Sequence, residues 1–128
     1  WGIKNRVRDI MKRADGELII FCRSPDFLRD HRSDLLSELK RGCHLVIIVD
    51  KMEKFEDFGF DLREIGRDFE EIYKDILVDG VDYSLECMII ADGKESIVIT
   101  RMGDERLAVV VKLPVVSALQ KGVLEHLV

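Results

Sequence analysis

The sequence predicts an α/β fold in which flanking helices cover a mixed sheet. Residues 17–49 show strand, helix and strand patterns in turn, and both strand segments are continuously apolar, as strands covered on both faces are. Residues 83–111 instead hold short apolar runs separated by turn residues, which is typical of antiparallel hairpins. With 128 residues, 47% of them apolar, the chain is long enough to bury a core as one domain over residues 1–128.

The first helix and the first strand are predicted from periodicity. Apolar side chains recur every three or four positions over residues 2–14, which predicts an amphipathic helix. Asp15 and Gly16 supply the signal that ends it. Leu18–Cys22 then forms an apolar run of strand length.

A β-α-β unit is predicted over residues 17–49. Ser24 offers an N-cap hydroxyl and Pro25 fits the first helical position, while Gly42 ends the helix. Leu45–Val49 is the second continuously apolar strand. Because the two strands are joined through a helix, they are predicted to pair in parallel.

A third helix is predicted over residues 62–76, where apolar side chains again follow helical spacing, although Gly66 weakens it. Between Glu53 and Glu86 the chain holds twelve acidic and four basic residues, a net charge of −8. A charge run of this kind usually forms a solvated helix face, and the alternative is a surface for cations or sugar hydroxyls.

The remaining elements are predicted from turn residues. Met88–Ile90 and Ile97–Ile99 flank Asp92-Gly93, a pair favoured in tight hairpins, so Asp92 is explained by turn geometry alone. A further strand is predicted at Leu107–Val111.

A last helix is predicted from Pro114 onward. Its predicted inner face consists of Val116, Leu119, Val123 and Leu127. The predicted order of elements is therefore α-β-α-β-α-β-β-β-α.

Composition excludes several classes of protein. The net charge of −5 argues against nucleic-acid binding by this domain through counterion release. No apolar run approaches the ~20 residues that cross a bilayer, so we expect a soluble protein without membrane contact. Three cysteines without a Cys-x-x-Cys motif favour the cytoplasm, and abundant charge with few amides resembles thermophile proteins. Because the chain starts at Trp1 without a leader, we expect it to be part of a longer protein.

The candidate ligand-binding residues follow the two parallel strands. Arg23 and Ser24 come after the first strand, and Asp50 and Lys51 come after the second. Open α/β sheets bind ligands beyond these carboxyl ends. Ser24 and the helix that it precedes are able to hold a phosphate or carboxylate, and the alternative is that Ser24 only caps the helix.

No cofactor is predicted. The chain contains neither a Gly-x-Gly-x-x-Gly nor a phosphate-binding Gly-x4-Gly-Lys loop, which leaves dinucleotide and nucleotide sites without support. The spacing of Cys22, Cys43, His44 and Cys87 does not favour a metal site. Buried structural cysteines explain these residues more simply.

Four segments resemble a known family, namely Trp1–Lys4, Ala14–Ile20, Leu39–Ile48 and Met88–Glu95. Together they resemble the carboxyl-terminal region of TrmB-family archaeal transcriptional regulators, a region similar to one half of the phospholipase D fold. The resemblance implies one effector-sensing and homodimerising domain over residues 1–128. It also implies that DNA is bound only by a winged helix-turn-helix module upstream, and that the effector is a small molecule, in several family members a sugar.

The phospholipase D resemblance also tests for catalysis. Enzymes of that fold use His-x-Lys-x4-Asp, and aligning the aspartate with Asp92 places Leu85 and Cys87 at the histidine and lysine positions. Leucine neither attacks phosphorus nor relays a proton. We therefore expect no enzymatic activity. The alternatives are a phosphodiesterase or nuclease of the phospholipase D type with displaced catalytic residues, and an assembly module without a ligand.

Overall fold

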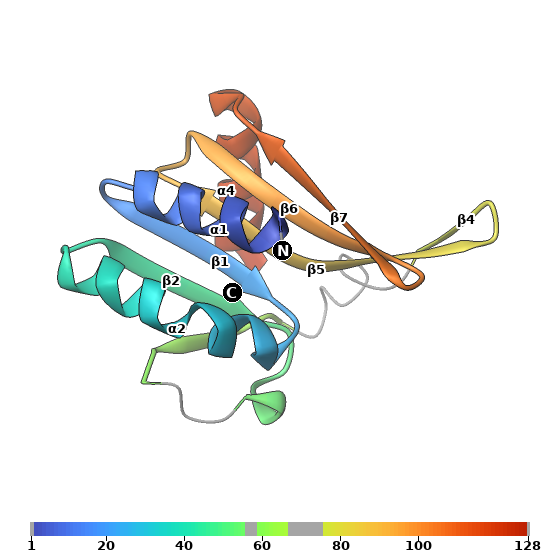
Figure 1. Ribbon diagram of the computed structural model, residues 1–128, viewed down its shortest axis with the longest axis horizontal. Coiled ribbons are helices and arrows are strands. Elements are labelled where there is room, and N and C mark those ends of the chain that lie inside the picture. The colour runs from blue at the N-terminus through green and yellow to red at the C-terminus, as the bar shows by residue number, and fades with distance from the viewer. Residues whose placement is uncertain (1, 56–58, 67–75, 128) are drawn as a thin grey trace.

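The structure is a computed structural model that describes residues 2–55, 59–66 and 76–127 (Figure 1). Its helical elements are α1 (Gly2–Arg13), α2 (Pro25–Lys40), the 3-10 turn η1 (Met52–Lys54) and α4 (Pro114–Leu127). Its strands are β1 (Glu17–Cys22), β2 (His44–Val49), β3 (Leu62–Glu64), β4 (Ile76–Val78), β5 (Val81–Ala91), β6 (Glu95–Met102) and β7 (Glu105–Val111). No helix in these ranges is long and apolar enough to cross a membrane.

The sheet is mixed, as predicted. Its strand order is β3-β2-β1-β5-β6-β7, and β4 pairs with β5 away from this path. β1 pairs in parallel with β2, with Glu17 opposite His44, which confirms the predicted β-α-β unit. On its other side β1 is antiparallel to β5, with Cys22 opposite Cys87. The predicted hairpins β5–β6 and β6–β7 are also present.

Helix α2 begins and ends at the predicted signals. The Oγ of Ser24 accepts a hydrogen bond from the Asp26 N–H at 3.2 Å, and Pro25 opens the helix. After the helix, Gly42 adopts a φ of +87°, a conformation that glycine reaches without a Cβ clash. Its N–H donates to the Leu39 carbonyl at 3.0 Å, and the chain then enters β2.

Different helices cover the two faces of the sheet. Figure 1 shows α1 and α2 on one face and α4 on the other. Because neighbouring residues of a strand point to opposite faces, β1 supplies apolar side chains to both cores, which explains its continuous apolar run. The core under α1 and α2 is the larger and includes Val7, Ile10, Met11, Leu28, Leu35, Leu18, Ile20, Ile47 and Ile89. The core on the α4 face includes Ile19, Phe21, Ile48, Ile90 and Leu124.

The predicted third helix is wrong over the residues that the structure describes. Residues 62–64 form β3, which pairs in parallel with β2, and residues 76–78 form β4. The part of the prediction at 67–75 lies outside the described residues. The backbone N–H of Ile65 donates to the Val49 carbonyl at 2.9 Å. Pairing with the open edge of β2 therefore outweighs the helical spacing.

The predicted inner face of the last helix is also wrong. The pattern places Val116, Leu119, Val123 and Leu127 inward. Leu119 and Val123 are instead 66% and 51% exposed, and the buried residues of α4 are Ser117 and Leu124. Val116 is partly buried, and the side chain of Leu127 lies outside the described part of the chain.

A partly buried polar contact accompanies this rotation of α4. The hydroxyl of Ser96, fully buried on β6, donates to the Gln120 Oε1 at 2.6 Å. This hydrogen bond stabilises a helix face that contains polar residues. A hydrophobicity pattern assigns such a face to the solvent side of the helix. As a result, Val115, Leu119 and Val123 form an exposed apolar stripe along α4.

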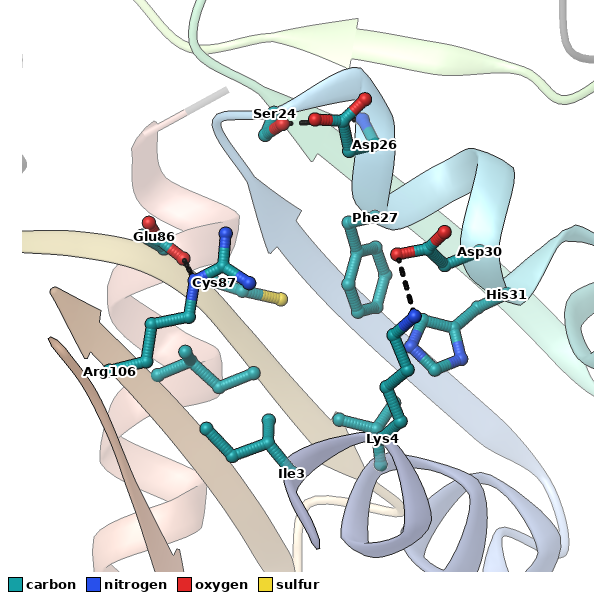
Figure 2. Close-up of a pocket in the computed structure, with 12 residues that line it drawn as sticks. Ile3, Lys4, Ser24, Asp26, Phe27, Asp30, His31, Glu86, Cys87 and Arg106 are labelled. Atoms are coloured by element: carbon teal, nitrogen blue, oxygen red, sulfur yellow. Dashed lines mark hydrogen bonds and ion pairs between the residues drawn. The ribbon is translucent and has the colours of Figure 1, made fainter. Parts of the chain in front are cut away.

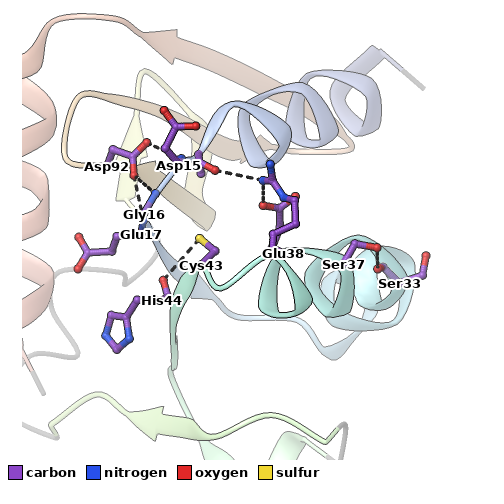
Figure 3. Close-up of polar contacts among 11 residues, drawn as sticks. Asp15, Gly16, Glu17, Ser33, Ser37, Glu38, Cys43, His44 and Asp92 are labelled. Atoms are coloured by element: carbon purple, nitrogen blue, oxygen red, sulfur yellow. Dashed lines mark hydrogen bonds and ion pairs between the residues drawn. The ribbon is translucent and has the colours of Figure 1, made fainter.

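Asp92 does more than form a hairpin turn. Its φ of 56° and that of Gly93, 64°, are typical of the tight turn predicted. Its carboxylate also accepts three backbone hydrogen bonds, from Asp15, Gly16 and Glu17, each at 2.9 Å (Figure 3). One side chain thus joins the β5–β6 hairpin to the turn between α1 and β1.

These contacts also change the acidity of Asp92. Burial raises the pKa of its carboxyl group, but the three backbone donors and Lys94 outweigh burial and hold that pKa below the ordinary value of 3.8. The carboxylate therefore stays charged at neutral pH. Its contribution to stability is present above the pKa of the unfolded chain and is lost as pH falls through the lowered value.

We expect Asp92→Ala to lower the free energy of unfolding by about 2 kcal/mol, because three charge-assisted hydrogen bonds are lost and water replaces only some of them. Chemical denaturation at pH 7 measures this change. The difference from the wild type should shrink as pH falls below about 4.

The matched control is Asp79→Ala. Asp79 also has a positive φ, 51°, and precedes a glycine in a hairpin turn, and no hydrogen bond of its side chain is present in the described part of the chain. An equal loss of stability in the two variants would show that turn geometry alone explains Asp92.

Candidate functional site

A small cavity lies beside the carboxyl end of β1. Its volume is about 70 Å³, and α1, α2, β5, β6 and β7 contribute to its wall (Figure 2). Its apolar side chains are those of Ile3, Val7, Phe27, Cys87 and Ile99. Its polar side chains are those of Lys4, Ser24, Asp26, Asp30, His31, Glu86 and Arg106. Elements far apart in the sequence therefore meet at one mixed polar and apolar site.

The N-terminal turns of α2 supply one side of this cavity. Because Ser24 caps the helix directly after β1, the next helical turns carry Phe27 and His31 to the cavity wall. Figure 2 shows the ring of Phe27 between Cys87 and His31. The rings of Phe27 and His31 lie 4.8 Å apart between centroids, tilted by 43°.

An irregularity in β5 supplies the opposite side. The register with β6 shifts between Leu85 and Cys87, so Glu86 is an extra residue and leaves the regular alternation of side chains. The two carboxylate oxygens of Glu86 contact Arg101 at 3.1 Å and Arg106 at 3.0 Å. Two cations on β6 and β7 thus hold one carboxylate at the cavity.

His31 is buried, with 4% of its surface exposed. Its Nδ1 lies 3.5 Å from the Asp34 Oδ2, and Arg8 lies 3.4 Å from the same oxygen. Burial lowers the pKa of His31 below 6.5, and the carboxylates of Asp34 and Asp30 offset only part of this effect. The ring is therefore neutral at pH 7 and offers one donor and one acceptor nitrogen.

The structure separates the four candidate residues predicted from the sequence. Ser24 lies at the cavity, where it also caps α2, so the cap function is confirmed. Arg23 and Asp50 meet beside it, with the Arg23 Nε 3.7 Å from the Asp50 Oδ2. The side chain of Asp50 is 2% exposed, and Lys54 also contacts it, at 2.5 Å. Lys51 is exposed and does not line the cavity.

Arg23 also connects this ion pair to the irregular part of β5. Its Nη1 donates to the Leu85 carbonyl at 3.3 Å, and its backbone N–H donates to the Glu86 carbonyl at 3.0 Å. Arg23 and Asp50 therefore brace the wall of the cavity and are not themselves in the lining.

Sequence reasoning misses most of the cavity. Lys4, Glu86 and Arg106 lie on three different elements, and no local motif relates them. Asp26 and Phe27 do follow Ser24 directly, so the cap motif is the one signal that points to this place.

The two positions aligned with the phospholipase D motif do not form a catalytic pair. Because of the register shift, Leu85 packs on the α4 face and Cys87 in the core under α1 and α2. Burial raises the pKa of the Cys87 thiol well above its ordinary value, and burial raises that of Cys22 to about 12. Both thiols therefore stay protonated, and a thiol is a poor nucleophile compared with a thiolate.

A family model described as "Transcriptional regulator TrmB, EBD N-terminal subdomain" matches residues 2–118. The chain belongs to the TrmB family of transcriptional regulators. The predicted family is thus confirmed, but the matching part is the N-terminal subdomain of the EBD rather than a carboxyl-terminal phospholipase D-like region. Similarity to half of the phospholipase D fold stays a prediction.

A solved structure shares this fold. It is described as "Structure of TrmBL2, an archaeal chromatin protein, shows a novel mode of DNA binding", and it matches with a TM-score of 0.63 at 16% sequence identity. The match covers 96% of this chain and 46% of the other, so this chain spans less than half of that protein. Comparison with curated proteins finds no match.

The lowered pKa of His31 predicts a pH dependence of stability. Near pH 6.5 the unfolded chain takes up a proton at this position more readily than the folded chain, so stability should fall as pH drops through this value. His31→Gln should reduce this slope, as measured by denaturation at several pH values. His44→Gln, at an exposed position on β2, should keep it. An unchanged slope in His31→Gln would contradict the assignment.

Proposed function

We propose that this chain is a non-catalytic domain of a cytoplasmic TrmB-family regulator that binds a small effector and forms a homodimer. DNA would be bound by a winged-helix module upstream in the protein, consistent with the net charge of −5 here. The observation that carries the proposal is the cavity at the end of β1, because one small site contacts two helices and three strands.

The side chains at the cavity suit a hydroxylated ligand such as a sugar. Towards such a ligand Glu86 and Asp30 would accept hydrogen bonds, Lys4 and Arg106 would donate them, and Phe27 offers a ring face. Without a ligand these groups pair with one another, Lys4 with Asp30 at 3.5 Å and Arg106 with Glu86 at 3.0 Å. The volume of about 70 Å³ is below the ~300 to 1,000 Å³ of sites that enclose a whole ligand. We therefore propose that the cavity receives one end of the effector.

The four residues predicted from the sequence keep a place in this proposal. The Ser24 hydroxyl contacts the effector while its helix cap is maintained, and the ion pair of Arg23 and Asp50 fixes the wall behind it. Lys51, exposed next to Asp50, would attract an anionic part of the effector that extends outside.

The cavity offers a way to transmit binding through α1. Ile3, Lys4 and Val7 all belong to this helix, so an effector contacts α1 and the sheet together. If the effector binds one position of α1 more tightly than another, the population of that position rises. A difference of about 1 to 3 kcal/mol is typical of such coupling.

We expect glucose, maltose or another member of a sugar panel to raise the melting temperature of the wild type, since a ligand of the folded state stabilises it by mass action. Phe27→Leu and Lys4→Gln should reduce that rise. Lys12→Gln, on the same helix but outside the cavity, is the matched control. Ser24→Ala should lower stability by about 1 kcal/mol through loss of the cap and should also weaken the effector response.

Two outcomes would contradict the sensing function. In the first, no sugar, nucleotide or organic acid shifts the melting temperature, which favours a plain assembly module. In the second, the protein hydrolyses bis(4-nitrophenyl) phosphate and His44→Gln abolishes the activity, which favours the phosphodiesterase alternative.

The apolar stripe of α4 supports the homodimer. Val115, Leu119 and Val123 are 69%, 66% and 51% exposed, and Leu113 precedes them at 61%. Apolar side chains gathered on one exposed face often mark an interface, and a self-complementary helix face suits a two-fold dimer.

We expect light scattering after size exclusion to show a dimer for the wild type and a monomer for Leu119→Glu, because a charge would then be buried in the interface. Ala118→Glu adds the same charge to α4 beside the stripe and should remain dimeric. A monomeric wild type at all concentrations would contradict the homodimer.

A further inference from the structure

A second cavity lies between α1 and the β6–β7 hairpin, and no residue of it lines the first cavity. Its volume is about 310 Å³, within the ~300 to 1,000 Å³ typical of small-molecule sites. Its floor is aliphatic and consists of Ile10, Ile97 and Val110. Ile10 and Ile97 are buried beneath this space, with 1% and 0% of their surface exposed. Val110 is partly buried and supplies most of the aliphatic surface that is open to a ligand.

The rim of this cavity is mainly basic. Arg6, Arg13 and Lys112 supply three positive charges, and Asp9 supplies one negative charge. The Nε of Arg13 lies 2.8 Å from the Glu95 carboxylate, so that cation is already paired. For Arg6 and Lys112 the described part of the chain contains no ion pair or side-chain hydrogen bond.

The cations of Arg6 and Lys112 come from opposite walls. Arg6 lies on α1 and Lys112 directly follows β7, the last strand in the order of the sheet. Figure 1 shows α1 beside β6, with β7 beyond it. A ligand bound on the aliphatic floor would therefore lie between Arg6 and Lys112.

We propose that this cavity binds a small organic anion with an aliphatic body, such as a medium-chain carboxylate. The body would cover the floor and exclude water from it, which is favourable in proportion to the apolar area buried. The anionic head would lie between Arg6 and Lys112, where an arginine and an ammonium group both donate charge-assisted hydrogen bonds. A ligand with only one of these two parts would leave either the apolar floor or the cations of the rim without a contact.

This site does not depend on the proposed sensing function. The sugar panel tests the cavity at the end of β1, and the probes below test the cavity between α1 and β7. A negative result for one proposal therefore leaves the other standing.

Titration of the protein with octanoate tests the proposal. We expect octanoate to shift the NMR methyl signals of Ile10, Ile97 and Val110, and to bind at least about tenfold more tightly than acetate or octanamide. Acetate lacks the body, and octanamide lacks the charge.

Variants locate the head group. Arg6→Gln and Lys112→Gln should each weaken octanoate binding about tenfold, the effect of losing one charge-assisted hydrogen bond. Lys12→Gln changes the net charge equally, on α1 but outside this cavity, and should leave the affinity within about twofold of the wild type.

Three results would overturn the proposal. The first is an absence of methyl shifts with octanoate. The second is equal affinity for octanoate and octanamide, which would show that the cations are not used. The third is equal weakening by Lys12→Gln and the two rim variants, which would indicate a general attraction of anions to α1.

Discussion

The carboxylate of Asp92 joins parts of the chain that are distant in sequence. It accepts hydrogen bonds from the N–H groups of Asp15, Gly16 and Glu17, up to 77 residues away. These N–H groups lie in the turn between the end of α1 and the start of β1. The position of α1 on the sheet therefore depends on this contact. Figure 3 shows the same turn next to the start of β2 at His44, whose N–H donates to the Gly16 carbonyl at 2.8 Å. Since α1 forms a wall of both cavities, the contact at Asp92 helps to fix the position of both. The first cavity lies at the opposite end of β1, and the second lies near the β5–β6 turn that contains Asp92.

The second constraint is the extra residue in β5. Glu86 interrupts the pairing with β6, and the interruption turns its carboxylate towards Arg101 and Arg106. The backbone of Arg23 then bonds to the Glu86 carbonyl and its side chain to Asp50. The ends of β1 and β2 are thereby linked to the β5–β7 meander at the place where the first cavity lies. An irregular strand is the means by which a regular sheet supports a polar site here.

Local signals predict much of this fold. The cap at Ser24, the glycine at Gly42 and the Asp92-Gly93 turn depend on a few neighbouring residues, so each could be predicted from the sequence. The prediction of a helix over 62–76 is wrong at β3, because the pairing of β3 with β2 is a tertiary contact that periodicity does not contain. The predicted inward face of α4 is wrong because periodicity does not contain tertiary polar contacts such as the partly buried hydrogen bond between Ser96 and Gln120.

Only one part of the candidate site, the helix cap at Ser24, could be predicted from a local motif. Ser24 lies at the cavity because helix capping and strand termination coincide there. Lys4, Glu86 and Arg106 come together only through the strand order β1-β5-β6-β7. In this order β1 pairs with β5, although Cys22 and Cys87 are 65 residues apart in sequence. No spacing rule contains that neighbour relation. The role of Asp92 was missed for the same reason, since its three donors lie at the start of the chain.

The strand order also bears on how the chain folds. β5, β6 and β7 follow one another through short turns, so their hairpins close small loops and form at little entropic cost. β1 finds its antiparallel partner only after a long loop has closed, and its parallel pairing with β2 needs α2 in place. Loop closure thus favours a meander that forms early and offers β5 as an edge on which the N-terminal half assembles.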